Sequence, residues 1–206
     1  MEIYDNAVLT DLTGLSNLTS VGAILEIYDN VALTSLDGLS GLTFVGYLEI
    51  YDNAALTNLD ALSSLANVEY DIEIHGNDAL TSLDGFSGLA IVLGGLAIYD
   101  NGVLTSLDGL SSVTSIGYDL LLHGNDALTG LDGLSGLATV GRDLYITDND
   151  ALTSLAGLTS FTSVGDDLDI HDNDCQSQAE AEAFAAGLAV GDVIDVYDNG
   201  ANHPCN

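Results

Sequence analysis

Three of the four histidines are the first residues whose type and spacing could do chemistry, because imidazole is a common metal ligand and proton carrier. His75, His123 and His171 follow one another at intervals of 48 residues. That interval spans two units of the sequence repeat described below, so stacked units at the ~4.8 Å spacing of β-strands would separate the rings by ~9–10 Å. One metal ion cannot span this distance, and no zinc site is predicted.

Aspartates are the second group that could hold an ion. Two pairs enclose an asparagine in the later repeats, namely Asp148 with Asp150 and Asp172 with Asp174. Carboxylates stacked ~4.8 Å apart repel by roughly 1 kcal/mol per pair in water, and calcium would relieve this through oxygen ligands. Neither the G-G-x-G-x-D repeat nor the EF-hand spacing is present, however. Loosely held counter-ions are therefore preferred, with calcium at these four residues as the alternative and no other cofactor expected.

Catalytic motifs are missing from the sequence. It contains no G-x-S-x-G elbow, no phosphate-binding glycine loop and no C-x-x-C pair. Serine and aspartate recur with the repeat, so no catalytic triad stands out. A glycosidase would need a local break in the repeat, and the only breaks are Glu69 and Leu93, which replace the usual glycine. We therefore expect a non-enzymatic protein without catalytic residues.

An internal repeat governs where all these side chains lie. One unit reads L-x-I-Y-D-N-x-x-L-T-S-L-D-G-L-S-G-L-T-x-V-G-x-D, and successive units begin 24 residues apart, once 23. The repeat is marked by eight asparagines: Asn6, Asn30, Asn53, Asn77, Asn101, Asn125, Asn149 and Asn173. The alternation in L-x-I predicts a short strand with both apolar residues inward. A single unit cannot bury its own apolar face, whereas stacked units bury a continuous one. A parallel β-solenoid of about eight coils is predicted.

The pattern L-x-I-x-x-N-x-x-L resembles the core of leucine-rich repeats, with one extra residue after the asparagine. The continuation L-D-G-L-S-G-L-x-x-V-G is similar to the receptor-L-domain-type repeats of secreted bacterial surface proteins, and the resemblance covers residues 1–174. It implies a mainly β fold, a right-handed leucine-rich-repeat-like solenoid with one long parallel sheet. It also implies an extracellular or cell-surface location and a role in binding or adhesion.

Several columns of the repeat are predicted to be scaffold. The asparagines should form a buried ladder that satisfies backbone groups of neighbouring coils. The Asp-Gly column should make turns, although Ala61 replaces glycine once, so a positive φ is not obligatory there. An unbroken threonine column from Thr10 to Thr153 lies in a tight bend. Ice binding through this column is a minor alternative.

The residues on either side of the inward isoleucine should point outward and form the candidate binding face. It comprises a glutamate stripe beside a Tyr/His stripe, with these members: Glu26, Tyr28, Glu49, Tyr51, Glu73, His75, Tyr99 and His123. Tyrosine is a favoured anchor in binding surfaces because it combines area with a polar tip. A basic peptide or a carbohydrate would suit tyrosine beside glutamate. The alternative is a solvated face whose stacked rings stabilise the sheet.

The two ends of the chain differ. Residues 175–206 break the repeat and are predicted to cap the solenoid, with a helical rhythm at Ala179, Ala183, Phe184 and Leu188 and a ninth strand in which Ile194 and Val196 face inward. Cys175 and Cys205 are expected to form a disulfide in an oxidising compartment, two free thiols being the alternative. The chain begins directly on a strand without such a cap. Self-association end to end through this first coil is therefore an alternative role, that of a structural surface protein.

Charge restricts the partners. Arg142 is the only basic residue other than histidine, against 32 acidic residues, and the net charge is −31. Such a chain repels phosphates, so nucleic acid is excluded as a partner. No apolar run is long enough to span a membrane, and no membrane insertion is expected. The predicted partner is a protein or a carbohydrate, or a second copy of the chain.

Overall fold

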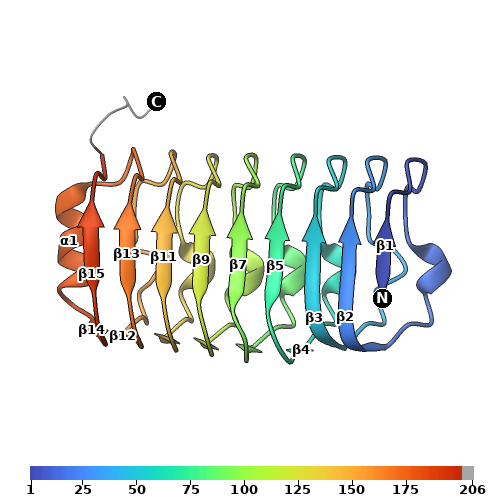
Figure 1. The fold of residues 1–206 in the computed structure, drawn as a ribbon, viewed down its shortest axis with the longest axis horizontal. Helices are drawn as coiled ribbons and strands as arrows, with labels where there is room; N and C mark the ends of the chain where they lie inside the picture. The colour runs from blue at the N-terminus through green and yellow to red at the C-terminus, as the bar shows by residue number, and fades with distance from the viewer. Residues whose placement is uncertain (201–206) are drawn as a thin grey trace.

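The computed structural model describes residues 1–200 and has one 15-stranded parallel sheet wound into a solenoid. Nine strands, one from each turn, lie side by side along its length (Figure 1). These are β1 (Glu2–Tyr4), β2 (Ser20–Tyr28), β3 (Phe44–Tyr51), β5 (Ile72–His75), β7 (Leu96–Tyr99), β9 (Leu120–His123), β11 (Leu144–Thr147), β13 (Leu168–His171) and β15 (Ile194–Tyr197). The predicted parallel β-solenoid is confirmed, including the ninth strand.

Short strands form a second arm of the sheet, which the sequence analysis did not predict. They are β4 (Asn67–Val68), β6 (Ile91–Val92), β8 (Ser115–Ile116), β10 (Thr139–Val140), β12 (Ser163–Val164) and β14 (Ala189–Val190). β2 and β3 are long enough to run through both arms and join them. The Val/Ile column of the repeat supplies the buried residue of most of these strands, such as Val68 and Ile116. Each pairs with its neighbour over only one or two residues, so no long run marks it in the sequence.

The interior follows the predicted columns. In every middle coil the two inward residues of the main strand are buried, as Leu120 and Ile98 illustrate. Identical columns stack in register along the parallel strands, so each coil covers the apolar face of the next. Ile194 belongs to the same column but is 49 % exposed, because in the final coil no further described strand stacks on it.

The asparagine column is a buried hydrogen-bonded ladder, as predicted. Asn101 is typical: its Nδ2 donates to the carbonyls of Ile74 and Tyr99 at 2.9 and 3.0 Å, and its Oδ1 accepts the backbone N–H of Asn77 at 3.2 Å. The ladder ends at the cap. There Gln178 Oε1 accepts the backbone and side-chain N–H groups of Asn199, at 3.1 and 3.2 Å. Gln178 therefore takes the place of the asparagine that a further coil would provide.

The Asp-Gly column makes tight turns, and five 3-10 helices lie along the first six coils of the described chain. They are η1 (Thr13–Leu15), η2 (Asp60–Leu62), η3 (Asp84–Phe86), η4 (Asp108–Leu110) and η5 (Asp132–Leu134). In Figure 1 the helical turns of the later coils lie behind the main sheet, and η1 lies beyond β1 at the N-terminal end. Only Gly38 of this column has a positive φ, +113°. The other glycines are needed for close approach: a Cβ on Gly109 would lie 1.8 Å from the carbonyl oxygen of Leu83. Ala61 lies one coil after Gly38, whose turn has the positive φ and contains no 3-10 helix.

Replacing Gly109 by alanine is expected to destabilise the fold by about 1–3 kcal/mol, because the new Cβ must push away the backbone of the coil before it. Gly130→Ala is the matched control, since a Cβ there meets nothing within 4 Å. Urea unfolding followed by circular dichroism measures both. Equal stability of the two variants would show that the coils can separate without cost.

The C-terminal cap contains α1 (Gln178–Ala185), which packs beside β15. The predicted helix is confirmed, and two of the four residues in its predicted rhythm pack on the core. Ala181 and Ala185 are buried, whereas Ala179 and Ala183 are exposed. Phe184 and Leu188 do contact the core. The alanines recur every second residue here, so composition alone could not fix the phase of the helix.

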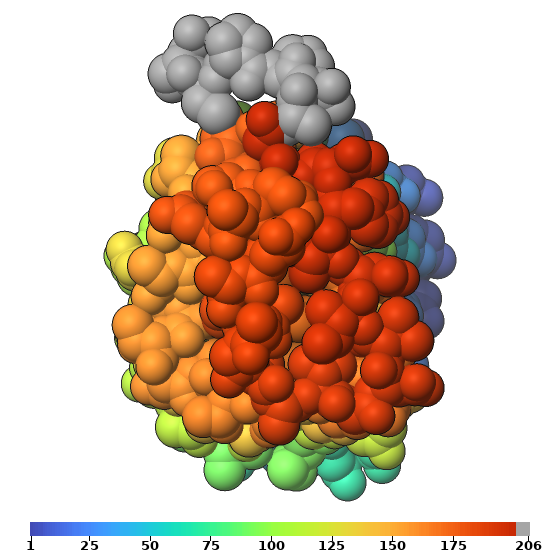
Figure 2. Space-filling view, turned by 90° about the vertical axis from the view of Figure 1, so that its left-hand side faces the viewer, coloured from blue at the N-terminus to red at the C-terminus, as the bar shows by residue number. Residues whose placement is uncertain are grey.

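Seen from the C-terminal end, α1 and the last coil cover much of the end of the solenoid (Figure 2). The predicted disulfide involves Cys205, which lies outside the described residues. Within the described chain, α1 is the only α-helix, and at eight residues it is too short to cross a membrane.

Candidate functional site on the outer face of the sheet

The predicted binding face lies on the outward side of the main sheet. Glu26, Glu49 and Glu73 stand directly opposite one another on β2, β3 and β5. The stripe ends there, because Ala97 and Leu121 occupy the same column on β7 and β9. All five side chains are partly exposed. The structure therefore brings together the carboxylates that the sequence predicted.

The Tyr/His column forms a continuous ring stack over five coils. Tyr4, Tyr28, Tyr51, His75 and Tyr99 follow one another with centroid distances of 4.3–4.9 Å and interplanar angles of 10° or less. His123 does not continue the stack, and Thr147 in the next coil is buried. A second pair, His171 and Tyr197, stacks at 4.5 Å. His123 is thus separate from the stacked part of the predicted face.

Electrostatic repulsion accumulates on this face. Burial, followed by the neighbouring charges of Glu73 and Glu26, raises the pKa of Glu49 above its usual value. Burial and the same stripe raise the pKa of Tyr51 to about 12. Burial lowers the pKa of His75 despite nearby carboxylates, which favours its neutral form. The face therefore combines negative charge with neutral rings.

His123 has the neighbours of a catalytic histidine but not their arrangement. Its Nδ1 lies 3.0 Å from Thr147 Oγ1 and 3.2 Å from Asp148 Oδ2. A nucleophile–base–acid relay needs the two oxygens on different ring nitrogens. Both contacts here use the same nitrogen, and the threonine is buried. We therefore interpret this cluster as a local hydrogen-bond network.

The aspartates before the asparagines have a conformational role that the sequence analysis missed. Asp148 and Asp172 have φ values of +54°, and every aspartate of this column lies between +50° and +56°. Short polar side chains tolerate this left-handed region, as does glycine, which replaces them at Gly76 and Gly124. That Asp/Gly exchange was the signal available in the sequence.

The four aspartates considered for calcium do not converge on one point. Asp148 contacts His123, and Asp172 contacts His171 at 2.9 Å. Among residues 1–200, no group of three or more His, Cys, Asp or Glu side chains is placed to hold a metal ion. Asp150 and Asp174, which follow the asparagines, do not complete such a group.

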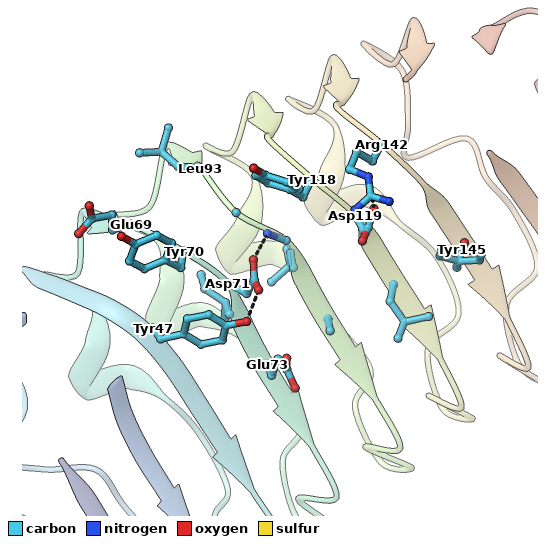
Figure 3. A pocket seen from close by; sticks show the side chains of 16 residues that line it. Tyr47, Glu69, Tyr70, Asp71, Glu73, Leu93, Tyr118, Asp119, Arg142 and Tyr145 are labelled. Carbon is cyan, nitrogen blue, oxygen red and sulfur yellow. Dashed lines mark hydrogen bonds and ion pairs between the residues drawn. The ribbon is translucent and has the colours of Figure 1, made fainter. Parts of the chain in front are cut away.

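A groove of about 740 Å³ opens on the same face, at the edge where the main strands begin (Figure 3). Its walls carry four tyrosines, four carboxylates and the only arginine of the chain. The labelled side chains are Tyr47, Glu69, Tyr70, Asp71, Glu73, Leu93, Tyr118, Asp119, Arg142 and Tyr145. Glu73 belongs to both the groove and the predicted face, so the two are continuous.

A second ladder, of aspartates, supports this edge and was also missed. Asp143 N–H donates to Asp119 Oδ1 at 3.1 Å, and the next coils repeat the bond from Asp167 and Val193. In the groove, Asp71 accepts hydrogen bonds from Tyr47 Oη and from Gly95 N–H, the latter at 2.6 Å. The hydrogen bond to Asp71 raises the pKa of Tyr47. The last aspartate of the repeat unit was the signal in the sequence.

Arg142 lies at the far side of the groove. Its Nε is 4.0 Å from Asp119 and 3.6 Å from Asp166. These contacts are solvent-exposed and so contribute little to stability. They hold the guanidinium among carboxylates of neighbouring coils, and the rest of the groove keeps its negative charge.

Comparison with known proteins identifies no relative. No family model matches the chain, and no significant match was found among curated proteins or solved structures.

Proposed function

We propose that this protein is a non-enzymatic binding module of the cell surface or extracellular space, whose outer sheet face takes a protein or glycan partner. The observation that carries this is the glutamate stripe Glu26, Glu49 and Glu73, which stands in register beside stacked rings. No cation of the described chain forms an ion pair with it. Charge complementarity favours a basic protein over a glycan.

Neutralising the stripe tests the proposal. The variant Glu26→Gln/Glu49→Gln/Glu73→Gln keeps side-chain size and removes three charges. Oligolysine peptides and neutral oligosaccharides serve as probes, measured by calorimetry. We expect the native protein to bind oligolysine and the variant to bind it at least about tenfold more weakly, because close charge complementarity is lost.

Non-specific attraction by the net charge must be separated from recognition by the face. The variant Asp37→Asn/Asp84→Asn/Asp108→Asn removes the same number of charges from exposed positions in the turns of the Asp-Gly column, outside the main strands. Equal weakening of both variants would refute a role for the face. Binding of an oligosaccharide but not of oligolysine would keep the binding module and assign it to glycans.

A further inference from the structure

One coil of the solenoid has glycine or alanine at outward positions where its neighbours have larger side chains. The coil that ends in β7 carries Gly94, Gly95 and Ala97 at three outward or edge positions. The preceding coil has Tyr70, Asp71 and Glu73 there, and the following coil has Tyr118, Asp119 and Leu121. We call this gap the notch. It is the centre of the groove described above.

The backbone of the notch also departs from the repeat. In neighbouring coils the residue at the position of Gly94 donates to its counterpart one coil earlier: Tyr118 N–H bonds Gly94 at 3.1 Å, and Tyr70 N–H bonds Gly46 at 2.8 Å. Gly94 makes no such bond to Tyr70 in the described chain. A Cβ on Gly94 would lie 2.3 Å from the Tyr70 carbonyl carbon and from Asp71 Oδ1. The glycine is therefore required for the close approach that shapes the notch.

Large side chains surround the notch without being buried by the fold. Tyr70, Tyr118 and Leu93 are 54 %, 53 % and 60 % exposed. Tyr70 and Tyr118 lie on opposite sides of the notch (Figure 3). Two coil spacings separate their backbones by ~9–10 Å, which leaves room for one flat group between the rings. Clustered exposed aromatic residues on a groove mark a binding site.

Charge decides what this site would take. Four carboxylates line the groove, Glu69, Asp71, Glu73 and Asp119, against the single cation Arg142. Glu69 and Glu73 have no ion-pair partner in the described chain. Aromatic faces and carboxylates together suit a guanidinium, which is flat, always charged and able to bond carboxylates while stacking on rings.

We propose that the notch binds an arginine side chain of a basic peptide, held between Tyr70 and Tyr118 and bonded by the carboxylates beside them. This proposal rests on the proposed function and deepens it by naming the chemistry of the ligand and the coil that binds it.

The test uses a short peptide with one central arginine and the same peptide with citrulline, which keeps the shape and removes the charge. Calorimetry is expected to show binding of the arginine peptide and at least about tenfold weaker binding of the citrulline peptide. Tyr70→Ala and Tyr118→Ala should each weaken binding by about tenfold. Tyr197→Ala removes a comparably exposed tyrosine at the far end and should change nothing.

A filling variant guards against loss through misfolding. Ala97→Leu places in the notch a side chain that the next coil already accommodates at Leu121, and it should abolish binding while the melting temperature is kept. The double variant Glu26→Gln/Glu49→Gln leaves Glu73 of the groove in place. Arginine-peptide binding that survives Ala97→Leu but falls in this double variant would overturn the notch and keep the proposed face. Equal binding of the citrulline peptide, or binding of a neutral disaccharide alone, would overturn the arginine assignment. Failure of the arginine peptide, of oligolysine and of the oligosaccharides alike would refute both proposals.

Discussion

Asn101→Asp is expected to destabilise the solenoid by about 3–5 kcal/mol, the largest effect of any single substitution considered. The aspartate has nearly the same shape but cannot donate hydrogen bonds. The buried carbonyls of Ile74 and Tyr99 would lose their partner, and a charge would be placed inside the ladder. Urea unfolding followed by circular dichroism at pH 7 measures the loss.

The control for this prediction is Asn6→Asp, in the same column of the first coil. Asn6 is exposed, so its carboxylate would remain hydrated and the loss should stay below about 1 kcal/mol. Asn101→Ala separates lost hydrogen bonds from added charge, and should fall between the two. If Asn101→Asp costs no more than Asn6→Asp, the ladder does not support the fold.

Mild acid is expected to stabilise this protein, in contrast to most proteins. The folded state raises the pKa of Glu49 and of Asp169, through burial first and neighbouring charges second. A carboxyl group with a raised pKa in the folded state binds its proton more readily there than in the unfolded state. The free energy of unfolding therefore increases as the pH falls from 7 through the raised pKa. The increase is complete below the ordinary pKa, which is 4.5 for Glu49 and 3.8 for Asp169. Removing the repulsion of Glu49 by its two neighbours would contribute about 1–2 kcal/mol.

Thermal melting at low ionic strength checks this. Between pH 7 and 4.5 the melting temperature should rise by about 2–8 °C, given the sensitivity of a chain of this size. Glu49→Gln should raise it at pH 7 and reduce its pH dependence. Sodium chloride should raise it at pH 7 more than at pH 4.5, because salt screens charges that acid has already removed. Melting that falls on acidification would mean that paired carboxylates outweigh the repelling ones.

Much of the fold could be predicted because the same residue type returns in each coil. The persistence of asparagine and of L-x-I fixed both the ladder and the inward columns. The phase of α1 could not be predicted, since its alanines alternate and a burial pattern needs a partner surface. The short second-arm strands were also missed, because two residues give no periodicity.

The candidate site was predicted only in part, for a related reason. Features that repeat from coil to coil are visible in the sequence, and the stripes that contain Glu26 and Tyr28 are of this kind. The notch depends on what is absent from one coil, Gly94, Gly95 and Ala97. Glu69 and Leu93 were noticed as breaks, but their meaning depends on the neighbouring coils between which they project. That adjacency appears only when the coils are stacked.

The notch also breaks a symmetry. Between β1 and β5 a shift by one coil brings like outward side chains onto one another, so a ligand that binds the ring stack or the glutamate stripe could occupy several nearly equivalent positions there. A ligand that needs the space left by the small residues of the β7 coil has a single binding position on the solenoid. The stoichiometry therefore distinguishes the two modes of binding. The notch binds one ligand per chain, whereas the number of ligands bound to the stripes depends on the length of the ligand.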